Sequence, residues 1–389
     1  MISQTLRLII FLLAVVVLFM TNAEAKLLKV GPGMEYSKPS QAAKAVNDHD
    51  TVEIAAGAYP YDVAIWDQNN LTIRGVGGYA HIQADGAAAG GKAAWVIRGN
   101  NTTIEYVEFS GARVRDKNGA GIRQEGAGLT IRNCYFHDNE MGILAGNNAD
   151  SDILIEYSEF ARNNVAGDFS KHRHFGHNIY MGRIRSFTLR YSYVHHGKIG
   201  HNVKSRALEN FILYNRIMDE EEGSSSYLID LSNGGTAYII GNLLQQGPHT
   251  DNSTLVAFAP EGEKNRSQGL FIINNTFVND NRTAIYIKNS SQTPAKVVNN
   301  IFGSIGDTII GGTSEMGKNL VTDAPGFVDR SKYDFHLTST SPAIDAGVFI
   351  DSGKRFPLMP EWQYVHPHGK ENRPMIGVID TGAYEYITQ

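Results

Sequence analysis

Short apolar runs recur along most of the chain, and each is bounded by Gly, Asn, Asp or Ser. The runs are rich in β-branched and aromatic residues and lack helical periodicity, so each predicts a β-strand. One set aligns on an aliphatic residue that recurs every 21 to 29 residues, with one interval of 36. Its members are Ile122, Ile143, Ile179, Val203, Ile229, Val256 and Ile285. We expect these side chains to point inward.

A second set of runs alternates with the first and carries a small or polar residue at one aligned place. These residues are Cys134, Ser158, Ser192, Asn215, Asn242, Asn275 and Asn300. Two strands per unit, repeated many times, are typical of a parallel β-solenoid. At a bend, such side chains can bond the equivalent residues one coil above and below, so we interpret the column as structural. Cys134 is the only cysteine, and we expect it to pack rather than to react.

The two ends of the repeat differ from its middle. Ser40 precedes the run QAAKAV and is a candidate N-cap for a short helix over the first coil. Beyond Gly303 the strand pattern weakens into turn-rich sequence. Such segments cover the open strand edges of a solenoid. We therefore predict an all-β parallel β-helix over 26–303, with a capping helix at its start and with final coils and an irregular C-terminal cap over 304–389.

The first 25 residues have the composition of an export signal. Arg7 precedes the apolar run Leu8–Met20, and Ala23-Glu24-Ala25 fits a small-residue cleavage site. The run is short for a membrane span, and an uncleaved anchor is the alternative. We predict that 1–25 is a signal peptide and that the mature chain is secreted or periplasmic, with no membrane contact after cleavage.

The residues that follow the aliphatic column should point outward, because neighbours on a strand face opposite sides. This outward column reads Arg123, Leu144, Tyr180, Lys204, Asp230, Ala257 and Tyr286. Tyr180, Lys204 and Asp230 should therefore stack on consecutive coils about 4.8 Å apart. Arg206 should lie beside Lys204 on the same face.

The tripeptide Gly-His-Asn occurs twice, at 176–178 and at 200–202. We predict that it marks one structural position on adjacent coils, with both histidines at the edge of the outer face and both asparagines pointing outward. The residues are His177, Asn178, His201 and Asn202. The alternatives are half-buried stacked histidines and turn asparagines.

The formal net charge of −5 argues against a nucleic-acid-binding protein, but the segment 171–206 is strongly cationic. It holds eight Lys or Arg residues, six of the thirteen histidines and no acidic residue. A cationic groove concentrates an anionic ligand, and we expect Arg183 and His196 of this segment to contact it. The acidic run DEEEG at 219–223 is either a solvated turn or a cation ligand.

The repeat, the asparagine column and the ending DFHLTSTSPAIDAG (334–347) resemble the right-handed parallel β-helix proteins that act on polysaccharides. These are the pectin-lyase-like proteins, including the chondroitinase B and alginate lyase group, and the resemblance covers nearly all of 26–389. HNVKSR (201–206) is similar to the Asn-x-Lys-Ser motif of the lyases. The resemblance implies a lysine base, Lys204, with an arginine partner and Ca²⁺ at the substrate carboxylate. The residues themselves identify no metal-ligand set and no other cofactor.

The implied reaction is β-elimination of a uronic-acid polymer, which needs a neutralised carboxylate, a base for the C5 proton and an acid for the leaving oxygen O4. We expect Lys204 to be the base and Tyr180 or His177 the acid, or the reverse. The residues expected to hold the carboxylate or the sugar are Arg206, Asn178, Asn202, His201, Asp230, Arg183 and His196. The prediction is a secreted, monomeric polysaccharide lyase for an anionic polysaccharide.

Three alternatives stay open. A C5-epimerase uses nearly the same groups and returns the proton to the other face. A glycoside hydrolase needs two carboxylates, and Asp230 is the only one expected near the centre, with Glu125 four coils away. A non-catalytic polysaccharide-binding protein would spread its aromatic and charged residues along the helix. Asp230 has a structural alternative too, as a salt-bridge partner of Lys204.

Overall fold

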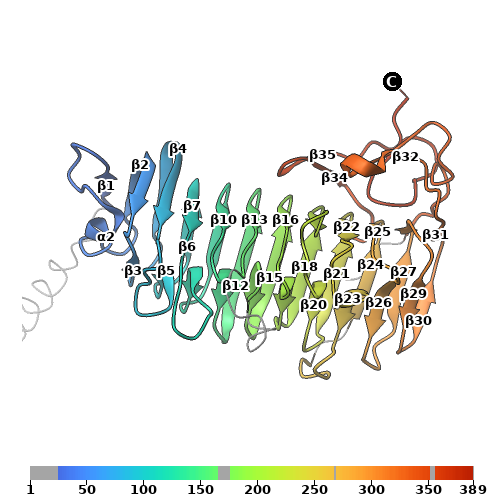
Figure 1. The fold of residues 1–389 in the computed structure, drawn as a ribbon, viewed down its shortest axis with the longest axis horizontal. Coiled ribbons are helices and arrows are strands. Elements are labelled where there is room, and N and C mark those ends of the chain that lie inside the picture. The colour runs from blue at the N-terminus through green and yellow to red at the C-terminus, as the bar shows by residue number, and fades with distance from the viewer. Residues whose placement is uncertain (1–24, 165–175, 267–268, 351–354, 389) are drawn as a thin grey trace, which may run out of the picture.

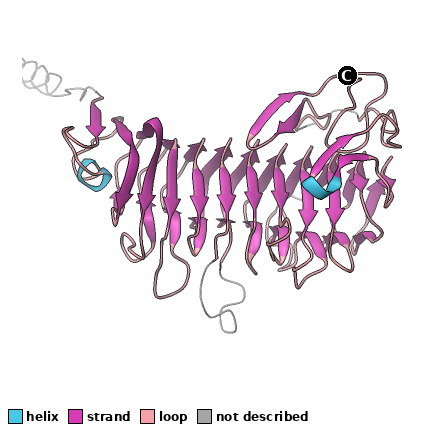
Figure 2. Ribbon diagram, turned by 45° about the horizontal axis from the view of Figure 1, so that its top comes forward, coloured by secondary structure: helices cyan, strands magenta, loops and turns pink. Residues whose placement is uncertain are grey.

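The computed structural model of the protein describes residues 25–164, 176–266, 269–350 and 355–388. Almost all regular structure in these ranges is β-strand, wound into a long stack of coils (Figure 1) with only two short helical segments (Figure 2). The predicted signal peptide, 1–25, lies outside the described residues except for its last residue. Within those ranges, no helix has both the length and the apolar character needed to cross a bilayer.

One side of the coils is a ten-stranded sheet in which all pairings are parallel. Its strands, in spatial order, are β3 (Ala64–Trp66), β5 (Ala93–Ile97), β8 (Ala120–Gln124), β11 (Met141–Ala145), β14 (Ile179–Met181), β17 (His201–Ser205), β20 (Tyr227–Leu231), β23 (Thr254–Phe258), β26 (Ile285–Asn289) and β29 (Asp307–Ile310).

The other side is a 21-stranded sheet to which most coils contribute two strands, joined by a sharp turn. The first stack of this sheet contains β1 (Leu27–Val30), β2 (Thr51–Pro60), β4 (Thr72–Gln83), β6 (Thr102–Glu105), β9 (Leu129–Arg132), β12 (Asn148–Glu156), β15 (Ile184–Arg190), β18 (Glu209–Leu213), β21 (Thr236–Ile240), β24 (Gly269–Ile273), β27 (Ala295–Val298) and β30 (Ser314–Met316). The second stack contains β7 (Val107–Ser110), β10 (Tyr135–His137), β13 (Glu159–Ala161), β16 (Tyr193–His195), β19 (Arg216–Met218), β22 (Leu243–Gln246), β25 (Thr276–Asn279), β28 (Ile301–Phe302) and β31 (Leu320–Val321). The long strand β4 pairs with both β6 and β7.

The predicted aliphatic column runs through the ten-stranded sheet in the expected register. Its members from Ile122 to Val256 pair with one another coil by coil, and all of them are fully buried. The prediction is wrong only for the last member of the column, because Val256 pairs with Ile287 and not with Ile285. This column supplies the continuous apolar core of the solenoid.

Six coils of this sheet also turn a second side chain inward, directly before the aliphatic one. In the pairing of β17 with β20, His201 lies opposite Tyr227 and Val203 lies opposite Ile229. The residue between them on each strand has no place in the pairing, because its side chain turns inward. The inward residues at this place include Ala94, Asn178, Asn202, Leu228, Leu255 and Tyr286, all fully buried. Tyr286 packs on the rings of Phe277 and Phe302, so its predicted outward orientation is wrong.

The polar column forms a hydrogen-bonded ladder at the turn between the two stacks. The backbone N–H of each member donates to the side-chain oxygen of the next: Cys134 to Ser158, Ser158 to Ser192, Ser192 to Asn215, Asn215 to Asn242, Asn242 to Asn275 and Asn275 to Asn300, at 2.9–3.2 Å. Asn319 adds a further rung. The structural interpretation of this column is therefore confirmed. Cys134 is fully buried, and burial raises the pKa of its thiol to about 12, so it packs as expected.

The N-terminal cap contains the predicted short helix, α2 (Pro39–Ala42). Its N-cap position is Lys38, whose backbone is extended, and Ser40 lies inside the helix. The expectation that Ser40 caps the helix is therefore wrong. Its N–H and Oγ both donate to Asp62, which ties the helix to the coil beneath it.

The C-terminal cap follows the last parallel strands, β30 and β31. It contains the antiparallel pairs β32 (Phe327–Asp329) with β33 (Asp334–Leu337) and β34 (Trp362–Val365) with β35 (Gly369–Asn372), and the 3₁₀ segment η1 (Arg330–Lys332). Its apolar side chains pack on the second stack, where Phe335 and Tyr364 join a buried cluster with Leu243. The segment thus covers the outer face of the late coils (Figure 1).

Replacing Asn242 by Ala should lower the unfolding free energy by roughly 3 kcal/mol, because its amide satisfies the buried carbonyl of Ile212 and the N–H of Asn215. Asn319→Ala removes the same side-chain amide at the partly exposed end of the ladder and should lower the unfolding free energy by only about 1 kcal/mol. Denaturant unfolding followed by circular dichroism measures both. Equal costs for the two variants would show that ladder position does not control stability.

Candidate functional site

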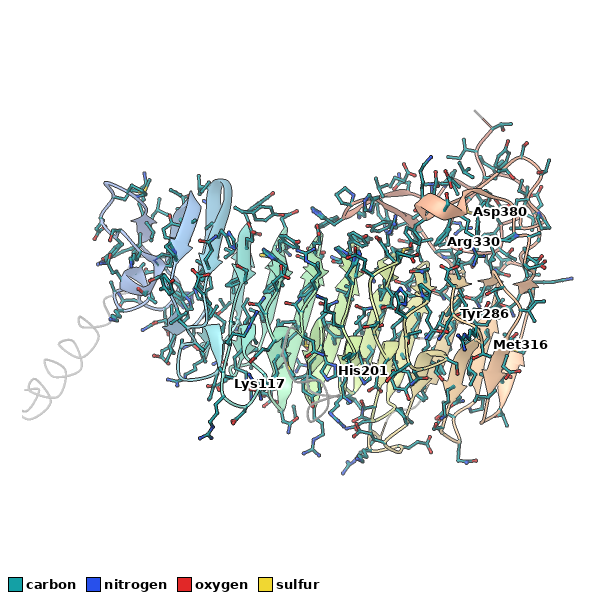
Figure 3. The ribbon with its side chains drawn as sticks, in the orientation of Figure 1. Lys117, His201, Tyr286, Met316, Arg330 and Asp380 are labelled. Carbon is teal, nitrogen blue, oxygen red and sulfur yellow. The ribbon has the colours of Figure 1, made fainter. Side chains whose placement is uncertain are left out.

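The residues predicted to stack on consecutive coils do so on the outer face of the ten-stranded sheet. Tyr180 pairs with Lys204, and Lys204 pairs with Asp230. A second row runs beside the first at the starts of the same strands, formed by the rings of His177, His201 and Tyr227. In the view of Figure 3, His201 lies near the middle of the long axis and away from Arg330 and Asp380 of the C-terminal cap.

The two histidines of the repeated tripeptide stack on each other, with ring centroids 4.9 Å apart. His177 also stacks on Tyr180, at 5.6 Å. The Nδ1 atom of His177 accepts a hydrogen bond from the backbone N–H of His201, which orients the ring. Both rings are almost fully buried, at 3% and 6% exposure. The ring of His177 is thus held by His201 and packs against the ring of Tyr180.

The two asparagines of the tripeptide do not face the site. They occupy the inward place before the aliphatic column, and both are fully buried. The side-chain N–H of Asn178 donates to the amide oxygen of Asn202 at 2.7 Å, and Asn202 donates to Asp219 at 3.1 Å. The outward orientation predicted for Asn178 and Asn202 is wrong, because they form a second ladder inside the solenoid.

Lys204 lies between two carboxylates. Its Nζ atom is 3.0 Å from Oδ2 of Asp230 and 3.3 Å from Oε1 of Glu261. Asp230 is only 2% exposed, and it also contacts Ser232 and Nε2 of His201. Burial raises the pKa of Asp230, although the neighbouring Lys204 acts in the opposite direction. Asp230 therefore lies beneath Lys204 as its partner.

Arg206 binds Glu261 with both arms of its guanidinium. Its two terminal nitrogens are 2.6 Å and 2.7 Å from the two carboxylate oxygens of Glu261. Its Nε donates to Oη of Tyr180 at 2.9 Å, and Nη1 also donates to Asn233. The hydrogen bond from Arg206 lowers the pKa of Glu261 to about 2, and the same bond raises the pKa of Arg206. The site thus holds a carboxylate among Arg206, Lys204 and Tyr180.

Glu261 and Tyr227 were not expected here. Glu261 lies in the turn after β23, two coils beyond Lys204, and its side chain is 38% exposed. Turn lengths vary between coils, so the strand repeat gives no register for this residue. The sequence offered only one indication of its role: Glu261 is an acidic residue in a turn on the side of the sheet that carries Arg206.

Arg183 and His196 lie on different sides of the coils, Arg183 after the strand that carries Tyr180 and His196 after a strand of the other sheet. The Arg183 side chain is exposed on the turn after β14. His196 follows β16 and contacts His195 and Glu220, so it belongs with the second stack. Contact of Arg183 and of His196 with a ligand stays a prediction.

The comparisons with known proteins agree with this architecture. Residues 61–244 match the family described as right handed beta helix region. Among solved structures, the protein resembles the crystal structure of pectate lyase Pel9A, with a TM-score of 0.64, 14% sequence identity, and coverage of 92% of this chain and 96% of that chain. The protein has a right-handed parallel β-helix fold of the pectin-lyase-like kind. No curated protein matches the sequence. The narrower resemblance to chondroitinase B and alginate lyases stays a prediction.

In this β-helix, the residues around Lys204 do not fit a calcium site. Ca²⁺ takes six to eight oxygen ligands, and carboxylates are the usual ones. The two carboxylates beside Lys204 are already neutralised by Lys204 and Arg206. We therefore derive no catalytic step through calcium.

The acidic run 219–223 is exposed at Glu221 and Glu222, as expected of a solvated turn, but its first residue, Asp219, is not. Asp219 is fully buried, where Asn202 and the backbone N–H groups of Ser225 and Gly247 donate to it. Burial raises its pKa from 3.8 to about 6. Asp219 therefore ends the inner asparagine ladder and links it to the turn that precedes β20.

Asp219→Asn should change how stability depends on pH. The folded protein binds a proton on Asp219 between pH 6 and pH 3.8, where the unfolded chain does not, so this group favours folding as the pH falls. That contribution is lost as the pH rises through about 6. Relative to the variant, the wild type should lose up to about 3 kcal/mol of unfolding free energy between pH 4 and pH 7. Parallel stability profiles for the two proteins would contradict the assignment.

Proposed function

We propose that the protein is a polysaccharide lyase that cleaves a uronic-acid-containing polymer by β-elimination at Lys204. The observation that carries the proposal is the bound carboxylate of Glu261, which is in contact with Arg206 and Lys204, with Tyr180 on the other side of Arg206. A uronate substrate carries the same group, and β-elimination requires its negative charge to be neutralised. We further propose that the protein works outside the cytoplasm as a monomer.

In the proposed mechanism, the substrate carboxylate takes the place of Glu261 on Arg206. A planar guanidinium with two parallel donors is well matched to this group. Neutralising the carboxylate makes the neighbouring C5–H bond more acidic. Because Tyr180 and Lys204 stand on adjacent coils about 4.8 Å apart, they can reach one sugar ring from neighbouring positions.

Lys204 then removes the C5 proton, the electron pair forms the C4–C5 double bond, and the C4–O4 bond breaks. Tyr180 gives its proton to the leaving oxygen, while Arg206 donates to Oη and stabilises the negative charge left there. Lys204 must itself lose a proton to act as the base. That proton leaves to solvent, and the Asp230 carboxylate 3.0 Å from Nζ holds the lysine side chain in place.

A glycoside hydrolase is the second candidate, because the structure places two carboxylates beside Lys204. Burial raises the pKa of Asp230, and the pKa of Glu261 is lowered to about 2, a separation that suits an acid and a base. Asp230 is 2% exposed and lies beneath Lys204, so a glycosidic oxygen has no access to it. The geometry therefore favours elimination.

Lys204→Ala should reduce lyase activity by about 10²- to 10⁴-fold, the usual contribution of a general base. Activity is measured as the ultraviolet absorbance of the unsaturated product, with a panel of uronic-acid polysaccharides as substrates. Lys288→Ala is the matched control, because Lys288 occupies the same outward row three coils further on. New reducing ends without absorbance would favour hydrolysis, and proton exchange at C5 without cleavage would favour epimerisation.

Glu261→Gln separates the two candidates. If Glu261 competes with the substrate carboxylate, its removal should lower KM by about 3- to 10-fold and leave kcat within a factor of a few. Initial rates over a range of polymer concentrations give both constants. A fall in kcat of two orders of magnitude or more would make Glu261 a catalytic carboxylate and contradict its role as a competitor.

A further inference from the structure

A second cluster of titratable side chains lies on the outer face of the 21-stranded sheet, at its N-terminal end. It contains His81 on β4, Glu108 on β7 and His137 on β10. One potential ligand atom from each lies within 4.8 Å of the others. The three strands are consecutive neighbours, so each coil contributes one residue.

The distances between these atoms are close to those of a metal centre. Nε2 of His81 is 3.5 Å from Oε1 of Glu108, and Nε2 of His137 is 2.8 Å from the same oxygen. Ligands at about 2.0–2.1 Å from a tetrahedral Zn²⁺ stand about 3.3 Å apart. The two distances from Glu108 lie within roughly half an ångström of that spacing, and all three atoms lie within 4.8 Å of one another. The side chains are 15–20% exposed, which leaves the cluster open to solvent on one side.

The outer contact of His137 is also that of a metal ligand. Nδ1 of His137 is 2.7 Å from the carboxylate of Asp138, and Arg162 holds that carboxylate in place. A metal-bound histidine usually donates its second ring N–H to such an acceptor, which fixes the ring and its tautomer. On His81, Nδ1 instead accepts from the side-chain amide nitrogen of Gln83 at 3.3 Å, so metal binding requires that amide to turn and present its oxygen. Both rings present Nε2 toward Glu108.

We propose that His81, Glu108 and His137 bind one divalent transition-metal ion, for which Zn²⁺ is the best fit. Two imidazoles and one carboxylate suit zinc, and three protein ligands leave a fourth position for water or an anionic oxygen. Oγ of Ser110 is 2.8 Å from Nε2 of His81, so a hydroxyl lies beside the cluster. The ion would link three consecutive coils. The site is separate from the proposed lyase site, which lies on the other sheet.

Zinc binding tests the proposal directly on the untagged protein, after chelator treatment and removal of the chelator. Isothermal titration and metal analysis should give one Zn²⁺ per chain. His137→Ala and Glu108→Gln should each weaken binding by at least about 100-fold, and Asp138→Asn by about 10- to 100-fold. His336→Ala is the matched control, because His336 is an exposed histidine with a carboxylate partner, Asp334, in the C-terminal cap. It should bind zinc like the wild type.

Two results would overturn the proposal. One is a wild-type protein that binds no zinc, and the other is equal binding by the wild type, His137→Ala and Glu108→Gln. Circular dichroism confirms that each variant is folded. Should a variant fail to fold, the visible spectrum of Co²⁺ bound to the wild type decides instead. Intense bands of a four-coordinate ion support the site, and the weak bands of a hexahydrate-like ion contradict it.

Discussion

The register between successive coils is the constraint on which the rest of the structure depends. In a parallel stack, a shift of one residue would turn every side chain to the opposite face. Two inward features prevent such a shift here: the fully buried aliphatic column and the ladder of side-chain oxygens at the turn between the stacks. Because these hold each coil directly above the last, Tyr180, Lys204 and Asp230 share one row.

The charges of the site follow from this stacking. The cationic segment delivers Lys204 and Arg206 to one face, and an unoccupied pair of cations there would be poorly stabilised. The chain supplies its own anion, Glu261, from a turn two coils further on. Asp230 provides the second counter-charge from below. The site therefore holds a carboxylate where the proposed uronate substrate would place its own, and the side chain of Glu261 is partly exposed there.

Much of the fold could be predicted from the sequence, because the aliphatic and asparagine columns are both periodic and buried. The errors at Asn178, Asn202 and Tyr286 share one cause. Strand alternation assigns these positions to the outer face, whereas these three coils turn two successive residues inward there. Glu261 could not be found in this way, since turns of unequal length carry no repeat. The pairing of Lys204 with Asp230 could be predicted from the sequence, because both residues lie on strands of the repeat.

The crystal structure of Lys204→Ala with a bound oligouronate tests the central claim most directly. The account predicts that a substrate carboxylate lies on both terminal nitrogens of Arg206, that Glu261 has moved away, and that C5 of that sugar faces the position vacated by Lys204. A sugar bound elsewhere, with the contact between Arg206 and Glu261 intact, would contradict it.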